Sequence, residues 1–267
     1  MIPRGARLDP RLYQIAVLAL LLAYGALALD FDVRPLQCGA ILATALGVQL
    51  ACARVAGIRN DPRSALISAL SLCLLLRTND LWVAAGAATI AIGSKFMLRV
   101  RGKHLFNPTN IVLVLLIACT DRVWVSPGQW GSAAYFGFLV ACLGGLVVTR
   151  ASRADVTFAF AAAYSALVVA RSSWLGEPMA IPVHRLENGA LIIFTFFMIS
   201  DPRTTPDSRA GRFVFAAIVA LVACYIQRAA LVARVLCAAR AATRCRAARP
   251  PLRLAIVDCR ACPWRIV

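Results

Sequence analysis

The chain has 267 residues, of which 61% are hydrophobic and 15% charged, and its formal net charge is +17. Soluble globular domains are about half apolar and about a quarter charged, so this composition excludes a soluble domain. The basic residues lie in short connections between apolar blocks, with few aromatic residues among them, which excludes a nucleic-acid-binding surface. The sequence therefore predicts an α-helical protein embedded in membrane lipid, without a nucleic-acid partner.

The apolar residues form nine segments along the chain. A helix that spans a bilayer needs about 20 mostly apolar residues. The first segment follows Arg4, Arg7 and Arg11, and we interpret it as an uncleaved span, because its length exceeds that of a secretory signal and further spans follow. The fold class predicted is all-α and polytopic, with segments at 12–29, 36–55, 64–77, 80–98, 108–120, 132–150, 154–171, 188–200 and 211–227.

Three of these segments, 64–77, 108–120 and 188–200, are short for a span. Each lies beside a polar tag that contains proline. Proline suits the first turn of a helix, and Asp or Asn caps it, so the first two segments should begin at their tags, whereas 188–200 should end at its own. Short spans interrupted by Pro and Gly are where transporter-like folds bind ligands; ordinary short helices with caps are the alternative. The tags are Asp61-Pro62-Arg63, Asn107-Pro108-Thr109 and Asp201-Pro202-Arg203.

Lys and Arg concentrate in the connections on one side of the predicted membrane, and only five lie on the other. The positive-inside rule then predicts a cytoplasmic N-terminus. We expect the membrane to be the inner membrane of a bacterium. The five on the outer side are Arg34, Arg77, Arg122, Arg171 and Arg185.

The composition changes abruptly after Gln227, where Ala, Arg and Cys dominate. We therefore divide the chain into a membrane domain, 1–227, and a basic tail, 228–267. The tail has two interpretations: a shifted reading frame near residue 228, or a native segment that binds anionic lipid. Cys259 and Cys262 form half of a metal-binding pattern, but no second half follows, so no metal site is expected.

Catalytic constellations are absent from the sequence, because its two histidines, His104 and His184, both lie in connections without a neighbouring nucleophile. The predicted membrane interior also lacks carboxylates, which argues against an autonomous proton pump. It offers amide and hydroxyl groups, which suit a neutral, planar, hydrogen-bonding ligand such as an isoalloxazine or quinone ring. These groups belong to Asn107, Thr109, Asn110, Asn188, Thr195 and Ser200.

Two stretches contain residue patterns that a membrane-spanning helix alone does not require. The first, 102–110, leads into an apolar helix whose start should offer unpaired backbone N–H groups and a positive dipole end, with Lys103 beside it; such a site would hold a phosphate or a ring carbonyl. The second runs over 187–206 and continues to Gly211-Arg212.

Both stretches resemble the NqrB/RnfD family, which comprises membrane electron-transport subunits of the Nqr pump and the Rnf complex. Residues 104–108 match its His-x-Phe-Asn-Pro pattern. Asn188-Gly189, Phe196-Phe197, residues 200–206 and Gly211-Arg212 match its second pattern. The resemblance covers roughly residues 8–227. It implies ten helices in two inverted five-helix repeats, similar to ammonium and urea channels, with flavin bound in the membrane region.

The family binds FMN covalently to a threonine in a Ser-Gly-Ala-Thr motif, which this chain lacks. The corresponding connection, 124–132, reads Trp-Val-Ser-Pro-Gly-Gln-Trp-Gly-Ser. We therefore expect noncovalent flavin, as FMN or riboflavin, or a quinone. The missing motif and the short chain resemble the standalone relatives found beside natural-product gene clusters, notably those for enediynes.

The resemblance predicts a membrane subunit of a flavin or quinone electron-transport system, linked in complete systems to ion transport. Its partners would be other redox subunits or a soluble electron donor, and it would not hold a complete active site alone. A channel or transporter for a small neutral solute is the alternative function. The predicted ligand-binding residues are Lys103, His104, Asn107 and Asn110 in one half-site, and Asn188, Asp201, Arg203, Thr204 and Thr205 in the other.

Overall fold

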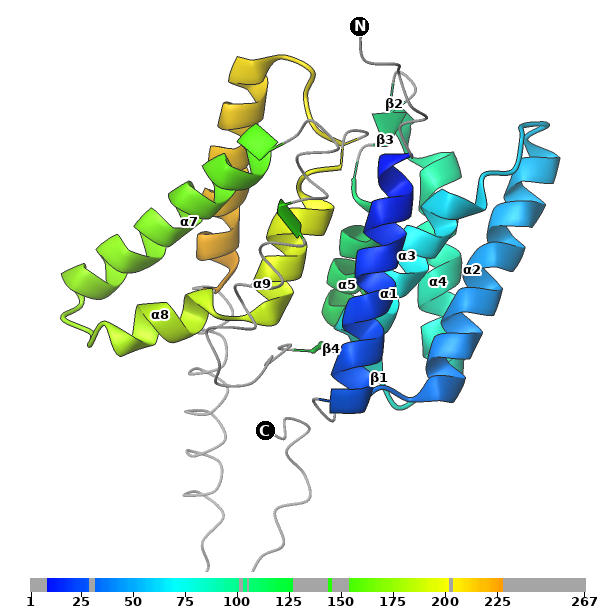
Figure 1. Cartoon of the computed structure of the whole chain (residues 1–267), viewed down its shortest axis with the longest axis horizontal. Helices are drawn as coiled ribbons and strands as arrows, with labels where there is room; N and C mark the ends of the chain where they lie inside the picture. Colours follow the sequence, from blue (N-terminus) through cyan, green and yellow to red (C-terminus); the bar gives the residue numbers. More distant parts are fainter. Residues whose placement is uncertain are drawn as a thin grey trace, which may run out of the picture.

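The computed structural model describes residues 9–28, 32–100, 103–104, 106–126, 144–145, 154–201 and 204–227, with the backbone alone at 28, 99–100 and 103–104. These residues are mostly helical (Figure 1). The predicted segment 132–150, apart from Gly144 and Gly145, and the tail 228–267 lie outside this part of the chain, so the division at residue 227 stays a prediction.

Five helices that run alternately up and down form the first group (Figure 1). Within it, α2 packs against α3 and α4, α1 packs against α3, and α4 packs against α5. Each helix coincides with a segment predicted from the sequence. The five are α1 (Pro10–Ala28), α2 (Pro35–Val55), α3 (Pro62–Leu75), α4 (Leu81–Met97) and α5 (Pro108–Cys119).

The second group contains α7 (Ala154–Trp174), the short α8 (Ala180–Leu186), which the sequence did not predict, and a helix over Arg209–Gln227. Between them, the predicted segment 188–200 forms two consecutive pieces, α9 (Gly189–Ile193) and the π-helix η1 (Phe194–Met198). The predicted inverted five-helix repeats are neither supported nor excluded by these elements, and they stay a prediction.

Short strands complete the fold, although the sequence predicted helices alone. After α3, β1 (Leu76–Thr78) pairs antiparallel with β4 (Val123–Val125), which follows α5. The strands β2 (Arg99–Val100) and β3 (Lys103–His104) form a second pair. Helix α3 therefore ends at Leu75, two residues before the predicted end, and its chain continues in extended form. A non-helical backbone at this position needs cover from protein or a wet cavity, and β4 supplies part of that cover.

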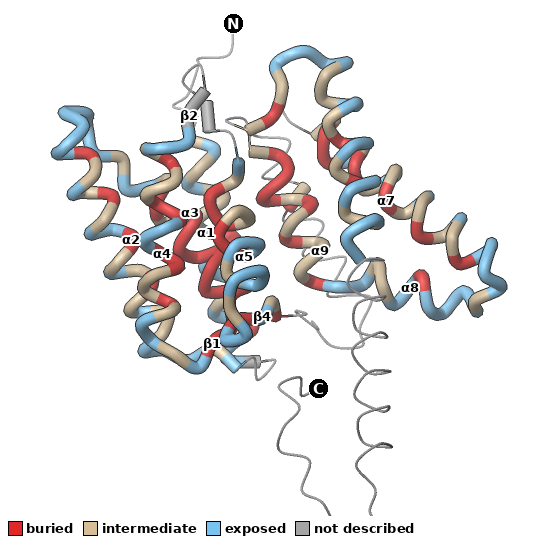
Figure 2. The backbone as a smooth tube through the Cα atoms, turned by 180° about the vertical axis from the view of Figure 1, so that it is seen from behind, coloured by how far each residue is buried: buried red, intermediate tan, exposed pale blue. Residues whose placement is uncertain are grey.

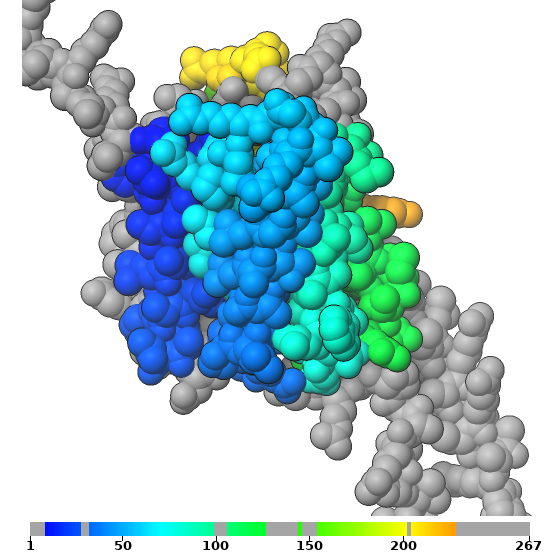
Figure 3. All heavy atoms as spheres, turned by 90° about the vertical axis from the view of Figure 1, so that its right-hand side faces the viewer, coloured from blue at the N-terminus to red at the C-terminus, as the bar shows by residue number. Residues whose placement is uncertain are grey.

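Apolar side chains face outward on both groups, as a membrane protein requires. Figure 3 shows the face on which α2 lies in the centre, between α1 and α4. Val55 at the end of α2 and Trp82 at the start of α4 are 91% and 86% exposed, which in water would be unfavourable for such large apolar surfaces. Among the described residues, four helices have the length and hydropathy to cross a membrane: Pro10–Leu27, Pro35–Val55, Ala154–Trp174 and Arg209–Gln227. The chain is a multi-pass membrane protein.

Buried residues form two clusters, and the α9–η1 segment belongs to both (Figure 2). Ile193, Phe197 and Met198 enter the core of α1–α5. Ile199 enters the core formed with α7 and the helix Arg209–Gln227, against which Phe194 also packs. This segment therefore couples the two groups of helices.

Candidate functional site

Three helices of the first group begin with an Asx-Pro pair. Asp9 Oδ1 accepts a hydrogen bond from Arg11 N–H at 3.0 Å before α1, and Asp61 Oδ1 accepts one from Arg63 N–H at 3.3 Å before α3. Asn107 Oδ1 accepts from Thr109 and Asn110 N–H at 3.1 and 3.4 Å before α5. The predicted starts of α3 and α5 are confirmed. The tag at Asp9 was missed, although its tripeptide Asp-Pro-Arg repeats the one at Asp61.

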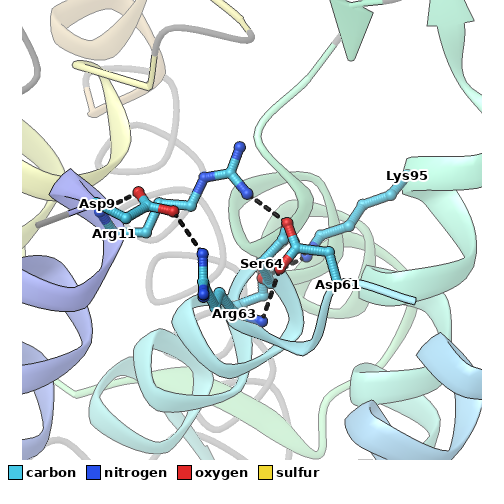
Figure 4. A network of polar contacts seen from close by, with 7 residues as sticks. Asp9, Arg11, Asp61, Arg63, Ser64 and Lys95 are labelled. Atoms are coloured by element: carbon cyan, nitrogen blue, oxygen red, sulfur yellow. Dashed lines mark hydrogen bonds and ion pairs between the residues drawn. The ribbon is translucent and has the colours of Figure 1, made fainter. Parts of the chain in front are cut away.

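The first two tags exchange ion pairs, which we call the Asp-Pro-Arg clasp (Figure 4). Arg11 donates to the carboxylate of Asp61, and Arg63 donates to that of Asp9 at 2.8 Å. The pKa of Asp9 lies below its ordinary value, mainly because Arg11 N–H donates to the carboxylate and also because Arg63 does, although partial burial acts in the opposite direction. The clasp holds the starts of α1 and α3 together.

Lys95 adds a third element to this end of the bundle (Figure 4). Its side chain, on the last turn of α4, is only 4% exposed. Lys95 Nζ donates to the Ser64 carbonyl oxygen at 2.6 Å and lies 3.2 Å from Ser64 Oγ, in the first turn of α3. The charge pattern treats Lys95 as one of the solvated charges that set topology, whereas the structure places it inside the bundle as a link between helices.

The π-helix η1 accepts side-chain hydrogen bonds from the first group of helices. Ile199 N–H donates to the Phe194 carbonyl, five residues back, so the regular α-helical pairing is interrupted. Near the end of η1, Gln14 of α1 donates to the Phe197 carbonyl at 3.2 Å, and Asn107 Nδ2 donates to the Met198 carbonyl at 3.4 Å. π-Helical turns occur frequently at functional sites. Asn107 therefore caps α5 with its oxygen and holds η1 with its nitrogen.

The start of α5 differs from the expectation in one respect. Unpaired backbone N–H groups were expected there, but Pro108 has none, and those of Thr109 and Asn110 are taken by Asn107. Ile111 N–H donates to the Asn107 carbonyl at 3.1 Å. The expectation of free donors is therefore wrong. The positive end of the helix dipole remains, and its cap is a neutral amide, whereas α1 and α3 have carboxylates at their caps.

After η1 the chain makes a tight turn that the second motif builds. The Asp201 carbonyl accepts hydrogen bonds from both the backbone and the hydroxyl of Thr204 and of Thr205, at 3.1–3.2 Å. Arg212 pairs with Asp155 at 2.6 Å and donates to the Asp207 carbonyl at 2.7 Å. These contacts close the turn onto the start of α7.

Gly211 lies where the turn has no room for a side chain. A Cβ there would lie 2.6 Å from Ser208 Oγ and 3.1 Å from Pro206 Cβ. The Gly-Arg pair after the motif is therefore explained by close packing of the glycine and by the Arg212 ion pair.

The structure brings most of the described candidate residues to one place. Asn107 and Asn110 begin α5, and the Asn107–Met198 contact places them beside the end of η1, which Asp201, Thr204 and Thr205 follow. Asn188 lies apart, because it caps the opposite end of α9–η1, with Oδ1 accepting from Ala190 N–H at 2.9 Å. Arg203 and the side chains of Lys103 and His104 lie outside the described residues.

Comparison with known proteins gives one family match. No curated protein shows significant similarity to the chain. The family model of NQR2, RnfD and RnfE matches residues 120–234. The match includes the second motif stretch and not the first, and it extends past the predicted domain boundary at residue 227. Over residues 120–234, the chain is similar to the NQR2, RnfD, RnfE family.

Proposed function

We propose that the protein is a membrane subunit of an Rnf/Nqr-type electron-transport system, and that it binds a flavin or a quinone noncovalently where α5 begins and η1 ends. The family match supports the coarser part of this proposal, a role in such complexes. The ligand and its site are proposed from the residues. The partners would be other redox subunits or a soluble electron donor.

The observation that carries the proposal is the double role of Asn107. Its side chain joins the 104–110 stretch to the 188–212 stretch, through the Met198 carbonyl. The two stretches that resemble the family are far apart in sequence, and an amide side chain with both a donor and an acceptor links them at the interrupted end of a helix. This arrangement favours a shared ligand site over two unrelated helix caps.

The polar groups near this contact fit a planar ring with carbonyl and N–H groups on its edge. Within the described part of the chain, the half-buried side-chain amide of Asn110 has no hydrogen-bond partner. Thr109 and Thr205 are almost fully buried, and both hydroxyls donate to backbone carbonyls, which fixes the shape of the site. Asn110, Asn107, Asp201 and Thr204 would hold the ring, and the bound group would supply the electron transfer.

Four other predicted residues do not belong to the described part of the proposed site. Lys103, His104 and Arg203 remain proposed ligand-binding residues that lie outside the described side chains. Asn188 is left out of the proposed site, because about ten residues of helix, on the order of 15 Å at helical rise, separate it from Asp201.

The absorbance spectrum of the full chain, purified in mild detergent, tests the proposal. We expect a flavin band or, after solvent extraction, a quinone. Asn107→Asp keeps the capping oxygen and removes the donor to Met198, so it should lower ligand occupancy, as should Asn110→Leu. Asn79→Asp, an exposed residue next to β1, is the control and should not change occupancy. A colourless wild type without quinone, which conducts a small neutral solute in proteoliposomes, would establish the channel function.

The orientation in the bacterial inner membrane is also a proposal. With the N-terminus in the cytoplasm, the clasp and the ligand site face the cytoplasm, and the turn at Gly176 after α7 faces the periplasm. A reporter fused after Ile58, which follows α2, should be cytoplasmic, and one fused after Glu177 periplasmic. The opposite result would invert the proposed orientation.

A further inference from the structure

The end of the first helix group opposite to the clasp contains a buried arginine beside two thiols. Arg77, the central residue of β1, is 7% exposed. Its Nη1 donates to the Cys73 and Leu76 carbonyls at 2.9 and 3.1 Å. Its Nη2 is buried and has no hydrogen-bond partner. An unpaired N–H donor group of a charged side chain is costly to bury, so this position needs an explanation beyond packing.

Cys38 and Cys73 lie beside this guanidinium. Cys38 is in the first turn of α2 and is half-buried, and Cys73 is near the end of α3 and is 2% exposed. Cys73 Sγ lies 4.0 Å from the Cys38 carbonyl oxygen, so the two cysteines are neighbours. Arg77 acts electrostatically on both sulfur atoms, and Asp32 is the carboxylate that acts on Arg77.

We propose that Cys38 and Cys73 form a redox-active dithiol, in which the free Nη2 of Arg77 stabilises the Cys38 thiolate. Cys38 is the more accessible sulfur and therefore the nucleophile, and Cys73 is its resolving partner. A nearby cation favours the thiolate, which is the reactive form of cysteine. From the charge pattern alone, Arg77 is a basic residue in a connection on the outer side of the membrane. That pattern does not predict its position beside the two cysteines.

The oxidant in this step is a membrane quinone. The Cys38 and Cys73 thiols each lose a proton, a bond forms between the two sulfur atoms, and two electrons pass to the quinone. The quinone takes up two protons and becomes the quinol. The disulfide would link the start of α2 to the end of α3. This chemistry does not depend on the ligand site at η1, because Cys38, Cys73 and Arg77 do not belong to that site.

The test uses the full chain in detergent, first reduced and then treated with a fully substituted short-chain benzoquinone, which cannot add to thiols. Free thiols are then blocked, and peptides are analysed by mass spectrometry. We expect a Cys38–Cys73 disulfide and the corresponding quinol. Cys52, half-buried on the same helix as Cys38, is the internal control and should remain a free thiol. Absence of the Cys38–Cys73 bond, or equal cross-linking of Cys52, would overturn the proposal.

The role of Arg77 is tested separately in the reduced protein. In Arg77→Gln, alkylation of Cys38 at neutral pH should be on the order of tenfold slower, because the thiolate fraction controls the rate. Arg77→Lys keeps the charge and should restore most of the rate, which a merely structural role of the arginine would not predict. Alkylation of Cys52 should be the same in all three proteins. Equal Cys38 rates in the wild type and Arg77→Gln would overturn the role of Arg77.

Discussion

Arg63 at the start of α3 donates to the carboxylate of Asp9 before α1 at 2.8 Å, and Arg11 at the start of α1 donates to the carboxylate of Asp61 before α3. Each Asp-Pro-Arg tripeptide thus supplies an N-cap for its own helix and a counterion for its neighbour. Both tripeptides place proline at the first helical position, where its fixed φ suits a helix. The exchange fixes the register of α1 relative to α3.

A double-mutant cycle measures this exchange. Asp9→Asn, Arg63→Gln and the double variant should show a coupling free energy of about 0.2–1 kcal/mol, because the side chains are partly exposed and solvent screens them. The measurement is unfolding of the purified protein in mixed micelles. Asp32→Asn with Arg34→Gln provides the control, since that pair is longer, at 3.9 Å, and more exposed. Equal coupling in the two cycles would contradict the clasp.

The depressed pKa of Asp9 predicts a pH dependence with a definite sign. A carboxyl group whose pKa is lower in the folded state stabilises the fold above its unfolded pKa, about 3.9 for Asp. This stabilisation is lost as the pH falls through the folded value. Asp9→Asn keeps an oxygen for Arg11 N–H and removes the titration. The wild type should therefore melt at a higher temperature than Asp9→Asn at neutral pH, and the difference should shrink below about pH 4.

Sequence reasoning predicted the helices and their capped starts, because caps depend on local chemistry. Asn107 and Asp61 each precede a proline and an apolar run, and the cap hydrogen bonds reach only two or three residues along the chain. The strand β1 was missed because Leu76 and Arg77 carry no signal that separates an extended backbone from a helix end. Its conformation is set by pairing with β4, which is distant in sequence.

The same limit applies to the candidate site. The amides of Asn107 and Asn110 were found from the pattern, but Gln14 was not, because its donor reaches Phe197 of a helix 183 residues away in sequence. Nothing local in 194–198 distinguishes a π-helix from an α-helix. Lys95 and Arg77 were both treated as solvated charges, and their burial follows from helix packing that one sequence does not reveal.

Asn107 and Asn188 give a matched pair for the next prediction. Both cap a helix through Oδ1, but Nδ2 of Asn107 also donates to the Met198 carbonyl. Because Asp is as good an N-cap as Asn, Asn188→Asp should leave the free energy of unfolding nearly unchanged. Asn107→Asp loses the donor and places an oxygen against a carbonyl oxygen, so it should cost about 1–3 kcal/mol.

Thermal unfolding of Asn107→Asp, Asn188→Asp and the wild type tests this prediction. An Asn107→Asp protein as stable as Asn188→Asp would show that the contact with Met198 contributes nothing. A loss in both variants to the same extent would assign the effect to the changed charge, and not to the missing donor.

Gly144 and Gly145 provide the last prediction, since these adjacent residues differ in their surroundings. A Cβ on Gly144 would lie 2.6–2.9 Å from Phe196 Cγ, Cβ and Cδ1, whereas a Cβ on Gly145 meets nothing within 4 Å. Phe196 belongs to η1, and its Cβ and Cγ lie close to the backbone, so a small side-chain rotation would not relieve the clash. Gly144→Ala should therefore cost about 1–3 kcal/mol through overpacking. Gly145→Ala should be neutral, or more stable by roughly 0.5–1 kcal/mol, because alanine favours the helix. Melting temperatures of the two variants check this, and a Gly144→Ala protein as stable as the wild type would show that the segment containing Gly144 does not pack on the π-helix.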